Sequence, residues 1–571
     1  MKKTVIVCLI TAIAVAACTA YDLRKPEDEI LFTGTTQPAE GELSMEDLVP
    51  PTGPVRLNVT TAIVLAVNNN KQLAVAKYSP LVSRTAELTA LAAFDPSFNA
   101  SLAFGRSETD QTNLGILPIA IGNTGSLLFG LSQLLPTGTK LDAGLTTDSS
   151  WPDRGTERHR TRLGLGITQS LLRGFGTDVN LVTLRQSRLD VDNSLYELRA
   201  VATDIVSRTE QAYWDYVQAQ RQVDIVTQSL ALANDQLEEI KFRVEIGKLA
   251  GIEIAAAEAE AASRTQDLIN ARATLQQNHL ALMRLINPPG EDNPFTRPII
   301  ILQQPTIEDI PLEPLEECIA TAKIRRPEMN QSRLQINRNA LDIVKTKNGL
   351  LPKLDLFAEL GKSGYSRSIL GTVGDMISGH SFDAKVGVSG EVSLTNRNAR
   401  AAFTRSLLVR EQDFEALYNL SQTVEADVRR AYVEVQRASE QVKAAAATRR
   451  LQEAKLEAEL AKFREGKSTS LQVAQVQRDL LASQISEQSA IAARLKAFVE
   501  LYRLEGTLLE RRSIRAPGDQ PTALVPQKPI ANWRVNGWGD DPEATGATAE
   551  TVTTEAETAT EATEAESDAD R

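Results

Sequence analysis

The chain has 571 residues, three cysteines and a net charge of −12. Residues 540–571 contribute −10 of that charge, so the rest of the chain is almost neutral. The chain has no overall basic excess of the kind that is typical of nucleic-acid-binding domains, and no nucleic acid partner is predicted.

The N-terminus resembles a bacterial export signal. Residues 1–17 begin with a basic stretch and continue as an apolar run that is too short to span a bilayer. The tetrapeptide Val15-Ala16-Ala17-Cys18 resembles the motif that is cleaved before a lipid-modified cysteine, so Cys18 is predicted to carry lipid, including palmitate. The alternative is an ordinary signal with a chance cysteine. Thr19 is typical of lipoproteins sorted to the outer membrane.

The cysteines predict a protein without disulfides. Cys8 leaves with the signal and Cys18 carries lipid, so Cys318 has no partner within the chain. No intramolecular disulfide is expected, even in an oxidising periplasm.

The chain contains one pattern twice. Residues 63–99 match residues 319–355 at a constant offset of 256, and residues 212–285 match residues 431–504 at a constant offset of 219. A repeated unit of about 200 residues is much longer than solenoid repeats, which run to about 20–50 residues. The sequence therefore predicts two similar halves of one architecture.

The duplication sets the predicted domain limits. The signal peptide (1–17) and a lipid-anchored linker (18–56) precede repeat 1 at 57–290. A linker at 291–311 leads to repeat 2 at 312–512, and 513–571 is a C-terminal segment with an acidic tail. The tail has too little apolar content to offset the entropy of ordering, which predicts disorder. A basic partner is the alternative to a solvated tail.

Repeat 1 contains segments with a period of two. Alternating residues at 98–104 and 163–167 predict strands. Repeat 1 is 37 residues longer than repeat 2 in this region, and the excess contains an additional β-hairpin near residues 112–148 around Pro136-Thr137-Gly138. An apolar face opposite a small or polar one is typical of outer membrane barrel strands, although a soluble sheet alternates in the same way.

A long helix without proline is predicted after these strands. Apolar or small residues recur with alternating spacings of four and three, which is a coiled-coil pattern, at Ile205, Thr209, Ala212, Tyr216, Ala219, Val223, Val226, Leu230, Ala233, Leu237, Ile240 and Val244. A helix from Thr177 to Ile246 would be about 105 Å long. It ends at the glycine of Gly247-Lys248, and a shorter helix returns through Leu285.

Repeat 2 follows the same plan with two strands, at 354–360 and 384–392. Its long helix is predicted from Asn398 to Glu465, its tip lies at Gly466-Lys467, and its return helix passes through Leu504. The apolar seam of this helix is interrupted by Arg449 and Gln452, which indicates a face that meets water.

These residues resemble the TolC-like outer membrane factor family over about 57–512. The resemblance lies in Arg326-Pro327-Glu328 and Leu351-Pro352, in the strand-to-helix junction at 167–176, and in the two glycine-centred tips. The tips are followed by Ile252-Glu253-Ile254 and Leu471-Gln472-Val473-Ala474-Gln475. The order of these motifs, found twice, is more specific than any one of them.

The resemblance implies an α+β membrane protein of the outer membrane. Three copies would share a transmembrane β-barrel that continues into a long periplasmic α-helical coiled-coil tunnel. The implied assembly is a homotrimer. Its implied partners are outer membrane lipid, a periplasmic adaptor (membrane fusion) protein and an inner-membrane transporter. The adaptor would dock at Gly247, Lys248, Gly466 and Lys467. The family also implies a tunnel gate near the second tip.

The sequence departs from the family in two places. Gln472 and Gln475 occupy gate positions that are acidic in the family, and Glu253 is the acid at the matching position in repeat 1. A gate closed by hydrogen bonds of Gln472 and Gln475 is therefore our hypothesis, with Glu253 as a solvated tip residue or part of the gate. The additional hairpin is the second departure. It would give the trimer 18 strands rather than the family's 12 if it joined the wall, and would change nothing if it folded outside.

No enzyme, cofactor or metal site is predicted. His159, His279 and His380 are far apart in the sequence, and His159 and His380 are expected in surface loops before strands. The leading function is a passive exit duct of a tripartite export system, serving small-molecule efflux or, alternatively, type I protein secretion. A lipid-anchored structural coiled coil without a pore is the alternative of another class.

Overall fold

The computed structural model describes residues 31–32, 50, 53–110, 119–152, 156–290, 293–304, 311–465, 467–518 and 520–524. The chain divides into two units, 1–524 and 525–571, and all described residues lie in the first. The predicted lipidation site Cys18, the tip residue Gly466 and the acidic tail lie outside the described residues.

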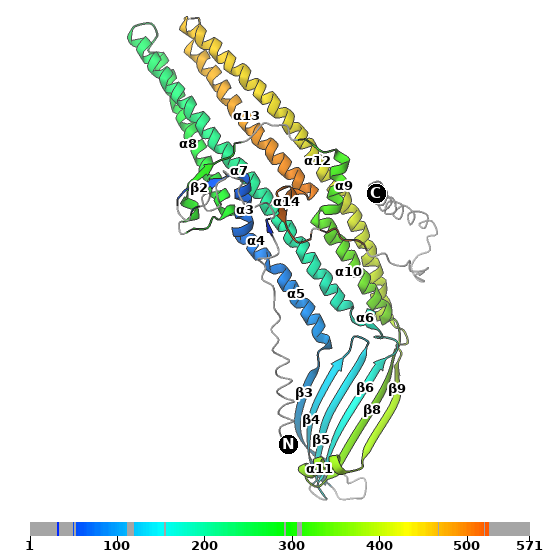
Figure 1. Ribbon diagram of the computed structural model, residues 1–571. Coiled ribbons are helices and arrows are strands. Elements are labelled where there is room, and N and C mark those ends of the chain that lie inside the picture. The colour runs from blue at the N-terminus through cyan, green and yellow to red at the C-terminus, as the bar shows by residue number, and fades with distance from the viewer. Residues whose placement is uncertain are drawn as a thin grey trace, which may run out of the picture. The chain divides into compact units, whose positions relative to one another are not determined.

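A six-stranded antiparallel sheet is built from both repeats (Figure 1). Its order is β3 (Ser97–Asp110), β4 (Ile119–Leu134), β5 (Thr139–Pro152), β6 (Arg158–Ser170), β8 (Lys353–Ser366) and β9 (Phe382–Glu391). β6 of repeat 1 pairs with β8 of repeat 2, from His159 opposite Ser366 to Ser170 opposite Asp355. One sheet therefore joins the two halves of the chain.

The additional hairpin of repeat 1 is β4–β5, and it lies inside this sheet between β3 and β6. Gly138 at its turn has φ +85°, a left-handed conformation that glycine adopts without a Cβ penalty. The amide of Gly138 donates to the carbonyl of Leu135 at 2.9 Å. The hairpin thus widens the sheet of this chain from four strands to six.

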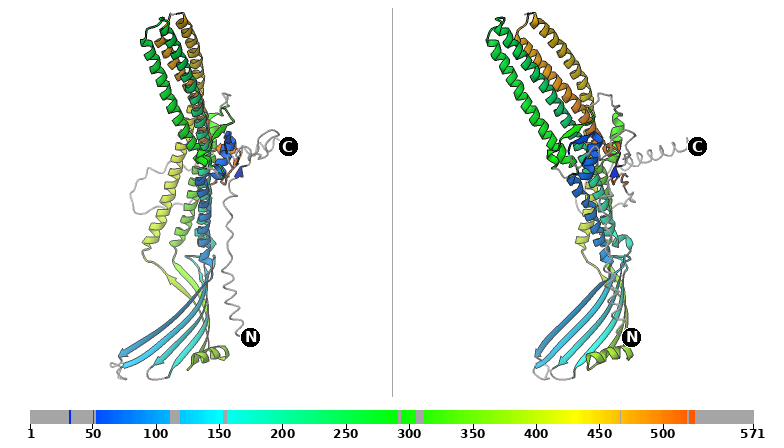
Figure 2. Two further views of the ribbon diagram at one scale, coloured as in Figure 1. Left: turned by 90° about the vertical axis from the view of Figure 1, so that its left-hand side faces the viewer. Right: turned by 60° about the vertical axis from the view of Figure 1, so that its left-hand side comes forward.

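Two helical hairpins carry most of the helical residues (Figures 1 and 2). The first pairs α7 (Val182–Glu245) with α8 (Ile252–Ile286), and the second pairs α12 (Arg397–Arg464) with α13 (Ser470–Glu505). The 64 residues of α7 and the 68 of α12 make helices of about 96 and 102 Å. The helix expected from Thr177 is divided, because α6 (Thr177–Asn180) ends before Leu181.

The predicted coiled-coil seams are the packed faces of these helices. Every predicted seam position of α7 is buried or half-buried, and Ile205, Val226 and Ile240 are almost fully enclosed. The seam of α12 is likewise buried from Val424 to Ala445. The polar seam residue Arg449 binds Glu487 of α13, Nε to Oε2, at 2.6 Å. Seam burial holds each long helix against its returning partner.

Short elements surround the middle of the long helices. They are α3 (Val59–Asn69), α4 (Lys71–Ala76), α5 (Tyr78–Leu91), η2 (Ala92–Phe94), η4 (Pro294–Thr296), α9 (Leu315–Arg325), α10 (Pro327–Gly349) and α14 (Leu508–Arg511). Two small sheets pair β2 (Val55–Leu57) with β7 (Ile299–Ile301) and β1 (Leu31–Phe32) with β10 (Ile514–Arg515). Tyr213 is fully buried here, as a packing residue should be, and its hydroxyl donates to the Gln303 carbonyl at 3.1 Å.

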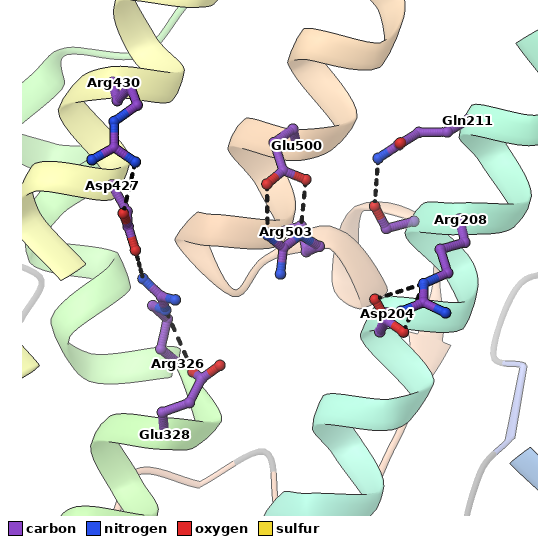
Figure 3. A network of polar contacts seen from close by, with 10 residues as sticks. Asp204, Arg208, Gln211, Arg326, Glu328, Asp427, Arg430, Glu500 and Arg503 are labelled. Carbon is purple, nitrogen blue, oxygen red and sulfur yellow. Dashed lines mark hydrogen bonds and ion pairs between the residues drawn. The ribbon is translucent and has the colours of Figure 1, made fainter. Parts of the chain in front are cut away.

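A polar network ties the helices together at this level (Figure 3). Arg326 lies within 3.4 Å of Glu328 in α10 and 3.6 Å of Asp427 in α12. Pro327 occupies the first turn of α10, where its missing amide hydrogen costs no helical hydrogen bond. These contacts give the Arg-Pro-Glu motif a structural role in fixing α10 against α12.

Two features differ from the sequence-based expectation. His159 lies inside β6 and is buried, with its ring 5.5 Å from that of Trp151, so its expected place in a surface loop was wrong. α11 (Ile369–Ser378) between β8 and β9 was not predicted, and it covers His159's side of the sheet at that end. Among the described residues, no helix is both long and apolar enough to cross a membrane.

Candidate functional site: the two-faced sheet and the tips of the helical hairpins

The large sheet has one apolar face, which we call the apolar belt. The strand registers place its large apolar residues on the same side of neighbouring strands, and they are exposed in this chain. They are Phe98, Leu102, Phe104, Phe129, Leu131, Leu141, Leu163, Leu165, Ile167, Leu356, Leu360, Phe382, Val386 and Val388. An exposed apolar patch of this extent indicates an interaction surface, and strands that are apolar on one face and polar on the other are typical of outer membrane barrels.

The opposite face, the polar face, carries charges of both signs. Arg162 of β6 reaches across β8 to Asp383 of β9, with 2.5 Å between Nη2 and Oδ2. Gly361 permits this contact, because a Cβ there would lie 2.6 Å from the Asp383 carboxylate and 2.7 Å from Arg162 Nε. Lys385 lies over the Phe357 ring at 5.0 Å. A face of this kind suits the water-filled interior of a pore.

The tip of the first hairpin is a glycine turn, as the sequence indicates. Gly247 has φ +74°, and its amide donates to the Val244 carbonyl at 3.0 Å. The next amide, of Lys248, donates to the Arg243 carbonyl at 2.8 Å, which satisfies the last carbonyls of α7. The side chain of Lys248 is exposed. The turn therefore presents a cation beyond the end of α7.

The tip of the second hairpin is closed by a capping box. The amide of Lys467 donates to the Lys462 carbonyl at 2.8 Å, and the Lys467 side chain is exposed. Thr469 caps α13, because its hydroxyl accepts from the Gln472 amide while Gln472 Oε1 accepts from the Thr469 amide. The hydroxyl of Ser468 donates to the Glu459 carboxylate and, together with Lys462, holds the pKa of Glu459 below its ordinary value.

The predicted gate residues have different surroundings. Gln472 is engaged in the capping box and also accepts from the Ser468 hydroxyl at 3.1 Å. Gln475 is exposed one turn further along α13. Glu253 is half-buried and accepts a hydrogen bond from the Ser470 hydroxyl, so it bridges the two hairpins of one chain. The structure thus brings Glu253 close to the second tip but gives the two glutamines separate roles.

Further links between the hairpins were missed from sequence. Arg478 of α13 lies 3.2 Å from Glu260 of α8, which also binds the buried Arg264 at 2.6 Å. Lys496 of α13 binds Asp215 of α7 at 2.6 Å. These partners are far apart in the chain, and charged residues on helices ordinarily indicate only a solvated surface. No sequence signal available here would have paired them.

A partly buried cluster in the middle of the chain has the residue types of a metal site. Ligand atoms of Glu313, Cys318 and Glu505 lie within 4.8 Å of one another. Arg511 donates to Glu313 at 2.6 Å and lies 3.4 Å from Glu505, so a guanidinium already supplies the positive charge. Burial raises the pKa of the Cys318 thiol to about 11, which disfavours the thiolate that a metal needs. The cluster is a structural ion-pair group.

A sheet with one apolar face, joined to two helical hairpins whose long helices are about 96 and 102 Å, is an arrangement typical of outer membrane channels. Residues 62–288 and 318–507 match the family described as outer membrane efflux protein. The chain belongs to this family. It is therefore a channel protein and not an enzyme.

Individual relatives agree with this assignment. Over 337 residues, which is 57% of this chain and 67% of the relative, the chain is 23% identical to "Outer membrane efflux protein BepC" of Brucella suis biovar 1 (strain 1330). Its fold is similar to that of the CmeC outer membrane channel of Campylobacter jejuni, with a TM-score of 0.59 and 16% identity over 80% of this chain and 89% of that one. It is also similar to that of the outer-membrane channel OprN, with a TM-score of 0.60 and 14% identity over 86% of this chain and 98% of that one.

Proposed function

We propose that three copies of this chain close one outer membrane pore and that the pore is a passive exit duct. The supporting observation is the open sheet. Among the described strands, β3 and β9 each pair on one side only, although both belong to a sheet with an apolar outer face. In a bilayer every backbone hydrogen-bonding group must be satisfied, so such a sheet has to close on itself. Pairing of β3 with β9 of the next copy satisfies both edges.

The number of strands follows from the number of copies. Six strands from each of three copies make a barrel of 18 strands. Barrel diameter grows roughly linearly with strand number, so this pore is about 1.5 times as wide as one of 12 strands. The additional hairpin β4–β5 supplies the difference, and the polar face would line the water-filled interior.

We place the helical hairpins in the periplasm, where their tips dock an adaptor protein that links to an inner-membrane transporter. The exposed cations Lys248 and Lys467, beside Gly247 and Gly466, are the contact residues we assign to that interface. Replacing both lysines with glutamate should weaken adaptor binding while leaving the pore in the membrane. Retention of normal adaptor affinity in a pull-down with the double variant would remove these residues from the interface.

The gate is assigned to Gln475, Gln472 and the link between Glu253 and Ser470. Gln472→Leu also removes the side-chain half of the capping box, so Gln472→Glu, which still completes the box, is the control for folding of the tip. Gln475→Leu removes a hydrogen-bonding side chain from an exposed position. Gln472→Leu with Gln475→Leu should raise the open-channel probability in a planar bilayer. Unchanged conductance traces for this pair would contradict a glutamine gate.

Small-molecule efflux is the function we favour, and type I protein secretion is the alternative. The test is retention of a fluorescent efflux dye in energised cells of a deletion strain and its parent. Higher retention, reversed by the wild-type gene but not by one with altered tips, supports efflux. Unchanged retention would instead point to protein secretion or to a redundant paralogue, which a comparison of the secreted proteins of the two strains would separate. A lipid-anchored structural coiled coil would show neither dye export nor pore conductance.

The lipid anchor at Cys18 belongs to the same proposal. Acylation there would hold the N-terminus at the membrane independently of the sheet. Labelling with radioactive palmitate should mark the wild-type protein and not Cys18→Ser. Equal labelling of both would show that the anchor is elsewhere.

A further inference from the structure

The short helix α11 lies at the end of the sheet away from the long helices (Figures 1 and 2). Its N-terminus is capped by Ser368, whose hydroxyl accepts from the Gly371 amide at 3.2 Å. The hydroxyls of Thr372 in α11 and Thr161 in β6 lie 2.6 Å apart, and both residues are fully buried. Thr161 shares the side of β6 with Leu163 and Leu165, so α11 packs on the side of the sheet that carries the apolar belt.

The sheet is shaped to receive this helix. Gly364 of β8 lies beneath it, and a Cβ there would be 2.1 Å from the Thr372 carbonyl oxygen and 2.3 Å from the Met376 amide. Asp375 accepts from the Tyr365 amide at 2.9 Å, and Lys362 Nζ donates to the Ile377 carbonyl at 3.0 Å. The polar groups of α11 are therefore directed to the sheet and its rim. The packing is a built feature of the fold.

The opposite side of α11 is apolar and uncovered in this chain. Leu370, Val373 and Ile377 recur at helical spacing along one stripe, and their exposures are 87%, 38% and 61%. Ile369 beside them is also exposed. Apolar surface facing water costs roughly 25 cal/mol per Å², and a surface helix in water normally turns its apolar side toward the protein. α11 has the reverse orientation.

The position of α11 selects what covers this stripe. The helix packs on β8 and β6, in the interior of the sheet, and not on the edge strands β3 and β9 where a neighbouring copy would pair. Its stripe continues the apolar belt toward the rim. Exposed Lys362 and Arg367 flank it, as cations do at a boundary with anionic headgroups. With 10 residues and a length of about 15 Å, α11 is too short to span a bilayer.

We propose that α11 is an interfacial helix that lies in the outer leaflet, with its Leu370–Val373–Ile377 stripe in the lipid at the boundary between acyl chains and headgroups. This inference rests on the proposed placement of the sheet in the outer membrane. In this role α11 fixes the depth of the pore in the bilayer through contact with lipid. The occupant of the stripe is thus a lipid surface.

The test uses the full mature protein in vesicles of phosphatidylcholine and phosphatidylglycerol with bromine on the acyl chains. An environment-sensitive fluorophore is attached to Leu370→Cys, to Val386→Cys in the apolar belt, or to Lys385→Cys on the polar face next to it. Cys318 is buried and does not compete for the label. Bromines are placed near the headgroup in one set of vesicles and deep in the acyl chain in another. Iodide in the buffer reports exposure to water.

The expected result is loss of most fluorescence at position 370 with shallow bromines, loss at position 386 with deep bromines, and quenching at position 385 by iodide alone. Iodide quenching at 370 with lipid quenching at 386 would overturn the helix proposal and leave the membrane-embedded sheet standing. Protection of 370 from both quenchers would also overturn it, in favour of a protein occupant. Absence of lipid quenching at both 370 and 386 would defeat the proposed function itself. A second variant carries Leu370→Gln together with a label on Ile377→Cys. If its fold is intact, the label at position 377 should give the result expected above for position 370.

Discussion

The orientation of the sheet can be tested with one pair of arginine substitutions. Leu165 lies at the middle of β6 in the apolar belt and is exposed in the isolated chain. Its neighbours across the strands are Ala143 and Leu360, so an arginine at 165 meets no opposite charge on that face. Ser126 lies on the polar face of β4, directly opposite Asp148. An arginine there gains an acidic neighbour.

The expected effects differ by orders of magnitude. An arginine on the lipid side of a barrel costs about 2–4 kcal/mol at the bilayer midplane. With 1.36 kcal/mol for each factor of ten, Leu165→Arg should lower the folding equilibrium constant per chain by about 30-fold to 900-fold. Ser126→Arg should stay within about 0.5 kcal/mol of wild type, as surface substitutions ordinarily do. Leu356→Arg, near the end of the belt, should cost about 0–1 kcal/mol because the penalty falls with depth.

The assay is equilibrium folding from urea into phospholipid vesicles. The folded fraction is measured from its shifted mobility on a gel run without heating the sample. All three variants introduce an arginine, and they differ only in the face of the sheet or in the depth within the bilayer at which it lies. Equal losses for Leu165→Arg and Ser126→Arg would refute a lipid-facing belt. A larger loss for Ser126→Arg would show that the two faces are assigned the wrong way round.

Three further predictions concern single groups. Because burial raises the pKa of the Cys318 thiol to about 11, maleimide labelling of the native protein at pH 8 should be much slower than labelling in urea, and equal rates would show that the cluster is open. Asp383→Asn leaves the charge of Arg162 without its nearest carboxylate on the polar face. The reversal potential measured across a salt gradient should therefore shift in the direction of greater anion selectivity. An unchanged reversal potential would place the pair outside the pore. The pKa of Glu459 is lower in the folded protein than in the unfolded chain, where it is about 4.3. The ionised carboxylate therefore stabilises the folded turn above that pH, and this stabilisation is lost as the pH falls through the lower folded pKa. Protection of the turn held by Ser468, measured as the exchange rate relative to the intrinsic rate at each pH, should therefore fall as Glu459 becomes protonated, and Glu459→Gln should remove that pH dependence.

Much of the scaffold was predictable because its patterns are local. The spacing of seam residues such as Ile205 and Val428 follows directly from helical geometry, and the glycine turn at Gly247 follows from the need for a left-handed residue. The sheet and its additional hairpin were predictable for the same reason, since alternation records which face each side chain takes.

The rest depends on packing between segments far apart in the chain. α11 contains Gly371 and Gly374, which lower helix propensity, and it is stabilised by contacts with Thr161 and Gly364 of two different strands. His159 lies between Ser149 and Ser366 of the neighbouring strands with its ring against Trp151, and this pairing is fixed only in the folded sheet. The capping role of Gln472 and the bridge from Glu253 to Ser470 were not predictable, because both require the folded tips.

Closure of the pore by edge pairing among three copies is the central claim, and disulfide trapping tests it most directly. Single cysteines on β3 at Ser101 or Leu102 are combined with single cysteines on β9 at Val386, Val388 or Ser389, and membranes are oxidised before electrophoresis without reductant. The account predicts that at least one pair gives covalent dimers and trimers and nothing larger. Monomers alone from every pair, or a ladder that continues beyond three chains, would contradict it.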